Sequence, residues 1–237
     1  MITEELFRDD AYMRTCETHV IGLNERGGIL LERTVFYPTG GGQPGDSGRL
    51  VRADGREIRI ATTLYDSDGR SIVHVPSVAC LDLVVGEPLT LELDWERRYA
   101  HMRAHTALHL LCSLVPYPVT GGQIGAAEGR LDFDIPAAII DKDELSAKIN
   151  TLIEGARAVD HRWISDEEMA ARPDLVRTMS VKPPTGRGRV RLVEIAACDL
   201  QPCGGTHVRS TAEVGRATVT KIEKKGAQNR RIKIVLA

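Results

Sequence analysis

Two short segments far apart in the chain carry residue types that could bind one metal ion together. The first holds His105 and His109, four residues apart in His-Thr-Ala-Leu-His-Leu-Leu. Positions i and i+4 of a helix lie on one face, with Cβ atoms about 5–6 Å apart, so both imidazoles can reach one ion. The second holds Cys203 and His207 in Cys-Gly-Gly-Thr-His, whose glycines allow a tight turn. Imidazoles with one thiolate are a donor set that suits zinc, so we predict one zinc site with these four ligands.

An isolated pair of histidines is equally compatible with two ordinary core or surface residues. Here Leu108, Leu110 and Leu111 make the segment apolar, and a buried histidine without a partner is costly. A shared metal ion would remove that cost. His101 lies one turn earlier on the same face, and we interpret it as a flanking residue. The remaining histidines have no partner in the sequence and are treated as ordinary: His19, His74 and His161.

The first pair of ligands requires a helix, and the sequence predicts one. Apolar residues recur at helical spacing from Glu96 to Leu114, and Pro116 and Pro118 stop the helix. Before residue 95 the pattern is different, because short β-branched or alternating runs are separated by Gly, Asp and Asn turns. This is typical of a small β-barrel or sandwich. The runs are Thr18–Leu23, Gly28–Phe36, Arg56–Thr62, Ser71–Val75 and Leu89–Leu93.

Helices and strands are mixed after the change of periodicity at Asp94-Trp95. Asp141 with Glu144, and Ser165 with Glu168, have the spacing of a capping box and predict two further helices. Strands are expected around Phe133 and in the later alternating runs Arg189–Ile195, Ala217–Ile222 and Arg231–Leu236. We therefore predict an α+β chain with two domains, a β-barrel domain over residues 1–95 and a zinc-binding α+β domain over residues 96–237.

The composition limits the class of protein. The 237 residues are 42% hydrophobic and 27% charged, which is the balance of a globular protein. No stretch approaches the roughly 18 apolar residues of a membrane helix, and the acidic start lacks the layout of a signal peptide. Five cysteines without regular spacing argue against a disulfide framework. We expect a cytoplasmic protein with no membrane partner.

Basic residues gather in two segments although the formal net charge is only −2. Residues 175–193 contain five basic and no acidic side chains, and residues 216–233 contain seven basic side chains and the single acid Glu223. A run of one charge is usually a solvated face. Two such runs in one domain of a nearly neutral protein favour an anionic partner that touches one face, such as RNA.

The two ligand segments also resemble a known family. His-Thr-Ala-Leu-His followed by Gln-Pro-Cys-Gly-Gly-Thr-His is similar to the editing domain shared by alanyl- and threonyl-tRNA synthetases. The glycine-rich motif of the β-barrel that precedes that domain is similar to Phe36-Tyr-Pro-Thr-Gly-Gly-Gly-Gln-Pro-Gly-Asp-Ser-Gly48 of this chain. Two shorter segments, Val193-Glu-Ile and Asn229-Arg-Arg-Ile, also resemble sequences of the family. The nearest likeness is to the free-standing alanyl-tRNA editing proteins, the AlaX group, in their medium-length form. It covers nearly the whole chain and implies a small β-barrel followed by a two-layer α/β editing domain. Because no adenylation domain precedes these motifs, we do not expect a synthetase.

The resemblance implies hydrolysis of the ester that joins a wrong amino acid to the terminal ribose of tRNA(Ala). The family's usual targets are serine and glycine on that tRNA. A synthetase pocket for alanine rejects such competitors by only roughly 10–200-fold, so a second, hydrolytic site makes up the difference. The implied cofactor is one Zn²⁺ per chain, and the implied partner is mischarged tRNA(Ala). Thr106 and Gln123 are candidates for polar contacts with the aminoacyl group, with local capping or turn hydrogen bonds as the alternative for each.

The resemblance also suggests where tRNA would touch the chain. Basic residues that are candidates for contact with the acceptor stem are Arg187, Arg189, Arg191, Lys224, Lys225, Arg230 and Arg231. The glycine-rich motif lacks the Gly-Lys-Ser/Thr ending of a phosphate loop and lies among strands, so we expect no nucleotide cofactor. The motif either forms tight turns or helps to build the editing site and hold tRNA. The residues to which these two alternatives apply are Gly40, Gly41, Gly42, Gln43, Asp46 and Gly48.

The role of the zinc stays open at the level of sequence. Four protein ligands are typical of structural zinc sites, whereas catalytic zinc usually keeps three and a water. The metal could polarise the ester carbonyl, position the amino acid or activate water. A second hypothesis is therefore a non-catalytic tRNA-binding module with a structural zinc. A zinc peptidase is the least supported, because no glutamate follows His105 to act as the base of that family.

Overall fold

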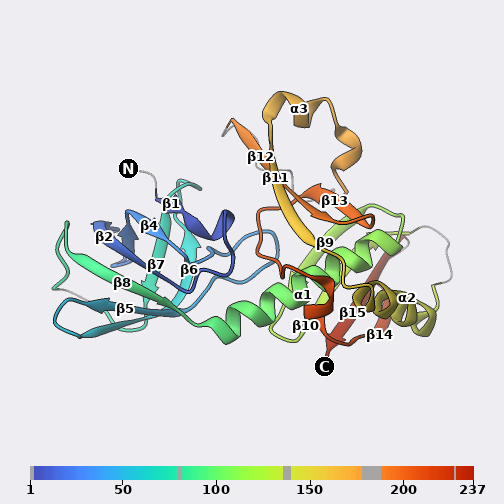
Figure 1. Ribbon diagram of the computed structural model, residues 1–237, viewed down its shortest axis with the longest axis horizontal. Helices are drawn as coiled ribbons and strands as arrows, with labels where there is room; N and C mark the ends of the chain where they lie inside the picture. Colours follow the sequence, from blue (N-terminus) through green and yellow to red (C-terminus); the bar gives the residue numbers. More distant parts are fainter. Residues whose placement is uncertain (1–2, 80–81, 136–139, 178–187, 227) are drawn as a thin grey trace. The chain divides into compact units, whose positions relative to one another are not determined.

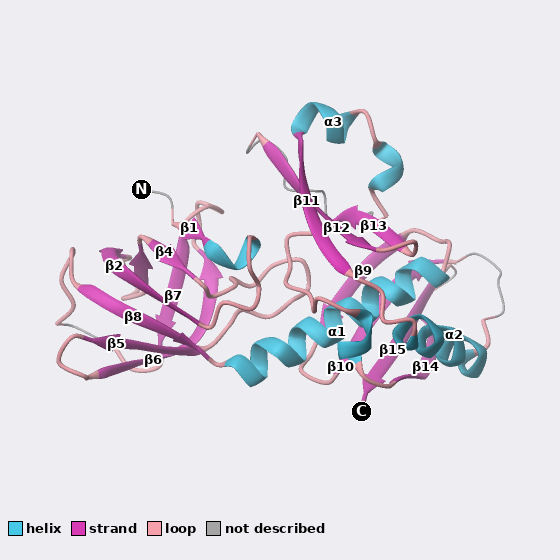
Figure 2. Ribbon diagram, in the orientation of Figure 1, coloured by secondary structure: helices cyan, strands magenta, loops and turns pink. Residues whose placement is uncertain are grey.

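The computed structural model describes residues 3–79, 82–135, 140–177, 188–226 and 228–237. Figures 1 and 2 show its helices and strands. The chain divides into two compact units, Met1–Tyr99 and Ala100–Ala237. Within the described ranges, no helix combines the length and the apolar character needed to cross a lipid bilayer.

The strands of the first unit close into a barrel, which confirms the β-barrel expected from the sequence. In β8, Leu89, Leu91 and Leu93 are buried and alternate with more exposed residues, as the period of a strand requires. Closing the sheet also removes strand edges that could pair with other chains. The order around the barrel is β2 (Thr15–Leu23), β3 (Ile29–Leu31), β7 (Ile72–Pro76), β6 (Glu57–Tyr65), β5 (Gly48–Arg52) and β8 (Pro88–Leu93). A short parallel pair, β1 (Glu4–Glu5) and β4 (Arg33–Thr34), belongs to the same unit.

Helix α1 (Trp95–Leu114) starts in the first unit and continues into the second. Trp95 packs against the apolar core of the barrel. Arg98 is fully buried and donates from Nε to the Asp46 carboxylate and from Nη1 to the Ala11 carbonyl, both at 2.9 Å. The predicted boundary after residue 95 therefore coincides with the start of the helix, whereas the division of the units lies after Tyr99. A change of periodicity marks where a helix begins, but packing decides which unit its first turn joins.

The glycine-rich motif forms a tight turn in the first unit. The backbone of Gly40 and the backbone of Gln43 exchange both hydrogen bonds, at 3.1 and 2.9 Å. Between them, Gly41 and Gly42 have φ of 56° and 82°. A two-residue hairpin turn with positive φ at both central positions is the I′ type, which favours glycine. Gly41 and Gly42 are therefore explained by the turn itself.

Other residues of the motif are fixed by close packing. A Cβ on Gly48 would lie 2.2 Å from the Glu92 carbonyl oxygen, so only glycine fits there. Gln43 and Asp46 are buried, and Oδ2 of Asp46 accepts from the Tyr37 amide at 2.6 Å as well as from Arg98. These contacts favour the structural alternative, a compact set of turns, for this motif.

Among its described residues, the second unit combines helices with two antiparallel sheets, which confirms the predicted α+β class. The larger sheet has the order β14 (Ala217–Lys224), β15 (Asn229–Leu236), β10 (Glu128–Asp134) and β9 (Val119–Ile124). The smaller has the order β11 (Val159–Ser165), β12 (Arg189–Ile195) and β13 (Asp199–Pro202). Leu108 of α1 packs on the larger sheet, because a Cβ on Gly129 of β10 would lie 3.0 Å from its Cδ1. The helix thus has one buried face against a sheet.

Helix α2 (Lys142–Glu154) covers the edge strand β14. The side chain of Asn150 donates to the Ala217 carbonyl at 2.7 Å and accepts from the Ala217 amide at 3.1 Å. Ser146 Oγ accepts from the Val219 amide at 2.9 Å. Backbone groups that an edge strand would leave unpaired are therefore satisfied by the helix.

Both predicted helix starts are capped, but only one of them has the complete capping box. Asp141 caps α2 by accepting from the amides of Asp143 and Glu144, each at 2.8 Å, while the Glu144 carboxylate lies 2.7 Å from Lys148 Nζ. Helix α3 (Asp166–Ala170) has the complete capping box of Ser165 and Glu168. Such caps each contribute about 1 kcal/mol to helix stability.

Replacing Gly45 by Ala is expected to lower the free energy of unfolding of the barrel by about 1–3 kcal/mol. The added Cβ would lie 2.0 Å from the Thr63 carbonyl oxygen. Urea unfolding followed by Trp95 fluorescence in a Trp163→Phe background measures this, since the chain has two tryptophans. In the matched control Gly22→Ala, the nearest atom is Leu30 Cδ1 at 3.8 Å, and the expected change is below about 0.5 kcal/mol. Equal stability of the two variants would contradict the packing explanation.

Acid is expected to weaken the barrel through His74, which is fully buried with Nε2 2.8 Å from Thr34 Oγ1 and Nδ1 3.1 Å from the Ile29 carbonyl. Burial lowers the pKa of His74 to about 4. In the unfolded chain His74 takes up a proton below about pH 6.5, whereas in the folded chain it stays neutral down to about pH 4. The barrel therefore has its full stability above pH 6.5 and loses stability as the pH falls towards 4. Between pH 6.5 and 5 the loss is about 2 kcal/mol.

The same Trp95 unfolding assay at pH 7 and pH 5 tests the role of His74. In His74→Gln the side chain cannot titrate, so its stability should change less between the two pH values than that of the parent protein. An identical pH dependence in both proteins would show that another group is responsible.

Candidate metal centre

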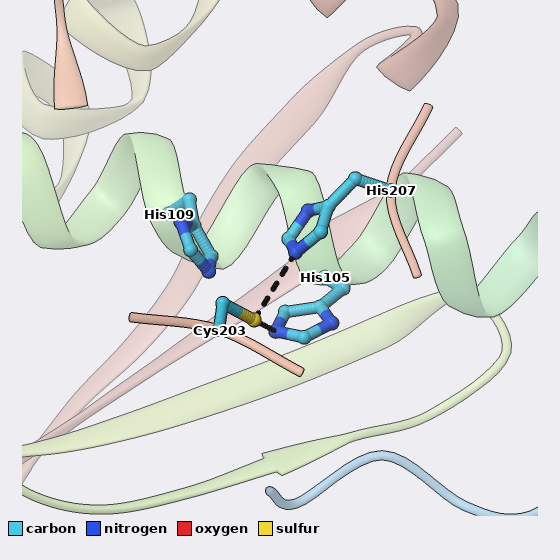
Figure 3. A group of neighbouring side chains, drawn as sticks. All are labelled: His105, His109, Cys203 and His207. Atoms are coloured by element: carbon cyan, nitrogen blue, oxygen red, sulfur yellow. Dashed lines mark hydrogen bonds between the residues drawn. The ribbon is translucent and has the colours of Figure 1, made fainter. Parts of the chain in front are cut away.

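Helix α1 presents the first two predicted ligands on one face. His105 and His109 are 7% and 6% exposed, and their ring centroids lie 5.2 Å apart. This is the separation that an i, i+4 pair has on a helix. Figure 3 shows both rings directed towards Cys203. The helix therefore supplies two imidazoles without any distortion of its backbone.

The second pair comes from the loop after β13. The ring of His207 lies 4.1 Å from that of His105 and 4.5 Å from that of His109, measured between centroids. The loop is held by the neighbouring strand β12, because the Cys203 amide donates to the Arg191 carbonyl at 3.1 Å. The Arg191 guanidinium in turn donates to the carbonyls of Cys203 and Gly205, at 3.1 and 3.0 Å. These bonds hold the Cys-Gly-Gly-Thr-His loop against strand β12.

The four side chains form one group that could hold a metal ion. Their potential ligand atoms all lie within 4.8 Å of one another. Cys203 Sγ is 3.5 Å from His105 Nε2 and 3.3 Å from His207 Nε2 (Figure 3). In a tetrahedral zinc site with bonds of about 2.0 Å to nitrogen and about 2.3 Å to sulfur, the distance between those donors is about 3.5 Å. The donor set and these two distances therefore fit a tetrahedral ion.

The charges in the group favour the thiolate form of Cys203. Burial raises the pKa of the Cys203 thiol, but the nearby His105 and His207 outweigh it and hold the pKa well below its usual range. Burial and the charge of His105 lower the pKa of His207. Burial lowers the pKa of His109 as well, but hydrogen bonds to Asp199 and Cys203 prevail and raise it to about 10. The group thus stabilises a thiolate, which is the form of cysteine that ligates a metal.

Three residues around the ligands were not predicted in the roles that they have. The Asp199 carboxylate lies 2.9 Å from His109 Nδ1, and Gln201 donates to Asp199 at 2.7 Å. Both lie on β13, which ends just before Cys203. Polar side chains so close in sequence to a ligand were the signal that could have identified them. Arg191 was predicted to contact RNA, but its side chain is only 6% exposed and supports the ligand loop. We therefore remove Arg191 from the candidate RNA contacts.

The two candidates for substrate contacts lie in different surroundings. Thr106 is fully buried, its Oγ1 is 3.1 Å from His207 Nδ1, and it accepts from the Val208 amide at 3.3 Å. These contacts favour a role in holding His207. Gln123 is exposed on β9, and its Oε1 accepts from Arg130 Nε at 3.2 Å. Gln123 therefore keeps a side chain that solvent, and hence a substrate, can reach.

The remaining basic candidates differ in how they are paired. Arg189 is exposed, and its guanidinium lies 4.1 Å from the centre of the Trp163 ring on the neighbouring strand. Lys224 and Lys225 are exposed at the end of β14. Arg231 donates to both oxygens of Asp132, at 2.7 and 2.8 Å, so its charge is already balanced. Arg230 is half-buried, and Arg187 lies outside the described residues.

Models of known families match two parts of the chain. The model described as the threonyl and alanyl tRNA synthetase second additional domain matches residues 190–233, which include Cys203 and His207. The model described as tRNA synthetases class II (A) matches residues 11–97, in the barrel unit. Each match thus lies within one of the two compact units.

Relatives of this chain are named as alanyl-tRNA editing proteins. The chain is 34% identical to an alanyl-tRNA editing protein AlaX-M of Methanosarcina acetivorans over 99% of both chains, and 33% identical to the protein of that name in Methanosarcina barkeri over 99% of both. It is 31% identical to an alanyl-tRNA editing protein AlaX-L of Pyrococcus horikoshii, over 94% of this chain and 55% of that one. With this identity over the full length, the chain belongs to the AlaX family of alanyl-tRNA editing proteins, in the AlaX-M group.

Proposed function

We propose that this protein is a trans-editing hydrolase that removes serine, and as a second substrate glycine, from mischarged tRNA(Ala). The observation that carries the proposal is the group of His105, His109, Cys203 and His207, which could hold a metal ion in a chain of the AlaX family. The bond hydrolysed is the ester between the amino acid and the terminal ribose. Correctly charged alanyl-tRNA is spared. Such a protein would work in the cytoplasm, where tRNA is charged.

The metal that we propose for this centre is zinc. Three imidazoles and one thiolate are borderline-soft donors, which suit zinc better than calcium or magnesium. When bound, zinc supplies a Lewis acid that can polarise a carbonyl or position a substrate group. Cys203 is the ligand that retains partial exposure, whereas the three histidines are buried. We therefore propose that the aminoacyl group approaches the centre from the side of Cys203.

The chain's own residues are proposed to do the rest of the binding. Thr106 keeps the His207 ring in place through the contact of 3.1 Å, and the exposed amide of Gln123 is a candidate for a hydrogen bond to the aminoacyl group. Backbone phosphates of the acceptor stem are proposed to contact exposed cations, because neutralising phosphates supplies most of the affinity for nucleic acids. The candidates with exposed or half-buried side chains are Arg189, Lys224, Lys225 and Arg230.

The direct test is deacylation of tRNA(Ala) charged with serine, glycine or alanine. The purified protein is expected to release serine at least about tenfold faster than alanine. Cys203→Ala and the double variant His105→Ala/His109→Ala are expected to lower this rate by about 100-fold or more, since each removes metal ligands. Ser113→Ala is the matched control, because its hydroxyl contacts Cys198 and the Leu110 carbonyl rather than the ligands.

Two results would contradict the proposal in different ways. Salt-dependent binding of tRNA(Ala) with no release of serine would indicate a non-catalytic tRNA-binding module with a structural metal. Full release by the ligand variants, after removal of metal with a chelator, would show that hydrolysis does not depend on this centre.

A further inference from the structure

A buried carboxylate beside the metal centre has no role in the function proposed above. Asp199 is the first residue of β13 and lies four residues before Cys203. Its side chain is only 3% exposed, and Oδ2 lies 2.9 Å from Nδ1 of His109, whose side chain is 7% exposed. A buried carboxylate needs hydrogen-bond donors to offset its loss of hydration. His109 is therefore one of the groups that must donate to it.

The contacts around Asp199 determine which nitrogen of His109 carries the proton. The Gln201 amide donates to Asp199 Oδ2 at 2.7 Å and lies 3.1 Å from His109 Nδ1. If Nδ1 accepted from Gln201, then two acceptors, Nδ1 and Oδ2, would face each other at 2.9 Å. An ionised carboxylate can only accept, so Nδ1 carries the proton and donates to Asp199.

In the neutral His109 ring, which is the form of histidine that ligates a metal, this arrangement leaves one lone pair. With Nδ1 protonated, Nε2 is the only ring atom that can ligate a metal. Rotation of the ring is restricted at the same time, because turning it would break the bond to Asp199. The hydrogen bond therefore fixes both the tautomer and the direction of the ligand.

His207 provides a comparison within the same site. Its Nδ1 lies 3.1 Å from the Thr106 hydroxyl, a neutral partner, whereas His109 faces a carboxylate. A charged acceptor makes the stronger hydrogen bond and increases the basicity of the ligating nitrogen. It also adds a negative charge near a divalent ion whose ligands include a single thiolate. Asp199 should therefore affect metal binding more than Thr106 does.

We propose that Asp199 is a positioning residue that holds His109 in the Nδ1–H tautomer and directs its Nε2 to the metal. The proposal rests on the metal centre of the proposed function, but not on the reaction that this centre carries out. Gln201 assists by donating to the same carboxylate oxygen and restricting its movement.

Zinc affinity of the full chain, measured by competition with a chromophoric chelator and without tRNA, tests this role. Asp199→Ala is expected to weaken zinc binding about 10–100-fold. Asp199→Asn keeps the shape and an oxygen that accepts from Nδ1–H, so its loss should be smaller. The matched control is Asp132→Asn, because that carboxylate is paired with Arg130 and Arg231 instead. Its zinc affinity should equal that of the parent.

A double-mutant cycle separates positioning from a general effect on folding. In a His109→Ala background, Asp199→Asn is expected to change zinc affinity less than about twofold, since the residue through which Asp199 acts is gone. Two-bond ¹H–¹⁵N correlation spectra of the histidine rings, recorded on the zinc-loaded protein, should show the Nδ1–H form of His109 in the parent. Any population of the other tautomer in Asp199→Asn would support the role further.

Two outcomes would overturn the proposal. One is parental zinc affinity in both Asp199 variants. The other is a loss that is as large in the His109→Ala background as in the parent chain. Neither measurement uses charged tRNA, so a failure to deacylate seryl-tRNA(Ala) would refute the proposed function and leave this result standing.

Discussion

The central constraint on this molecule is that four ligand atoms from two distant segments must lie within 4.8 Å of one another. Helix α1 alone brings two of the four ligands together, because His105 and His109 share one of its faces independently of the rest of the fold. The other half depends on tertiary structure. Cys203 and His207 reach the helix only because β13 ends beside it and the loop after β13 turns back sharply. The two sheets of the second unit are thus the framework of the site.

Holding these ligands requires a second set of residues. Three contacts hold different parts of the group: Arg191 binds the loop carbonyls, Thr106 contacts the His207 ring and Asp199 contacts the His109 ring. Side chains of such buried polar networks stabilise a site only when nearly all of their hydrogen bonds are made. The same surroundings favour the thiolate form of Cys203, since imidazoles and the Gly205 amide lie next to its sulfur.

What the sequence could predict follows from how local each signal is. The four ligands, the strand Arg189–Ile195 and the caps of α2 and α3 depend on residues close in sequence, and each was predicted. Asp199 and Arg191 act through pairing of β12 with β13 and contact with α1, which no local pattern contains. Strand β9 was not predicted because its two glycines, Gly121 and Gly122, are typical of turns. Basic residues were predicted by type alone, so partners such as Asp132 for Arg231 could not be foreseen.

X-ray absorption at the zinc edge of the purified protein is the most direct test of this metal centre, because it reports the atoms bound to the metal. We expect one sulfur at about 2.3 Å and three nitrogens with imidazole scattering at about 2.0 Å. The sulfur signal should disappear in Cys203→Ala. A spectrum without sulfur in the parent protein, or one unchanged by that substitution, would contradict a metal centre built from His105, His109, Cys203 and His207.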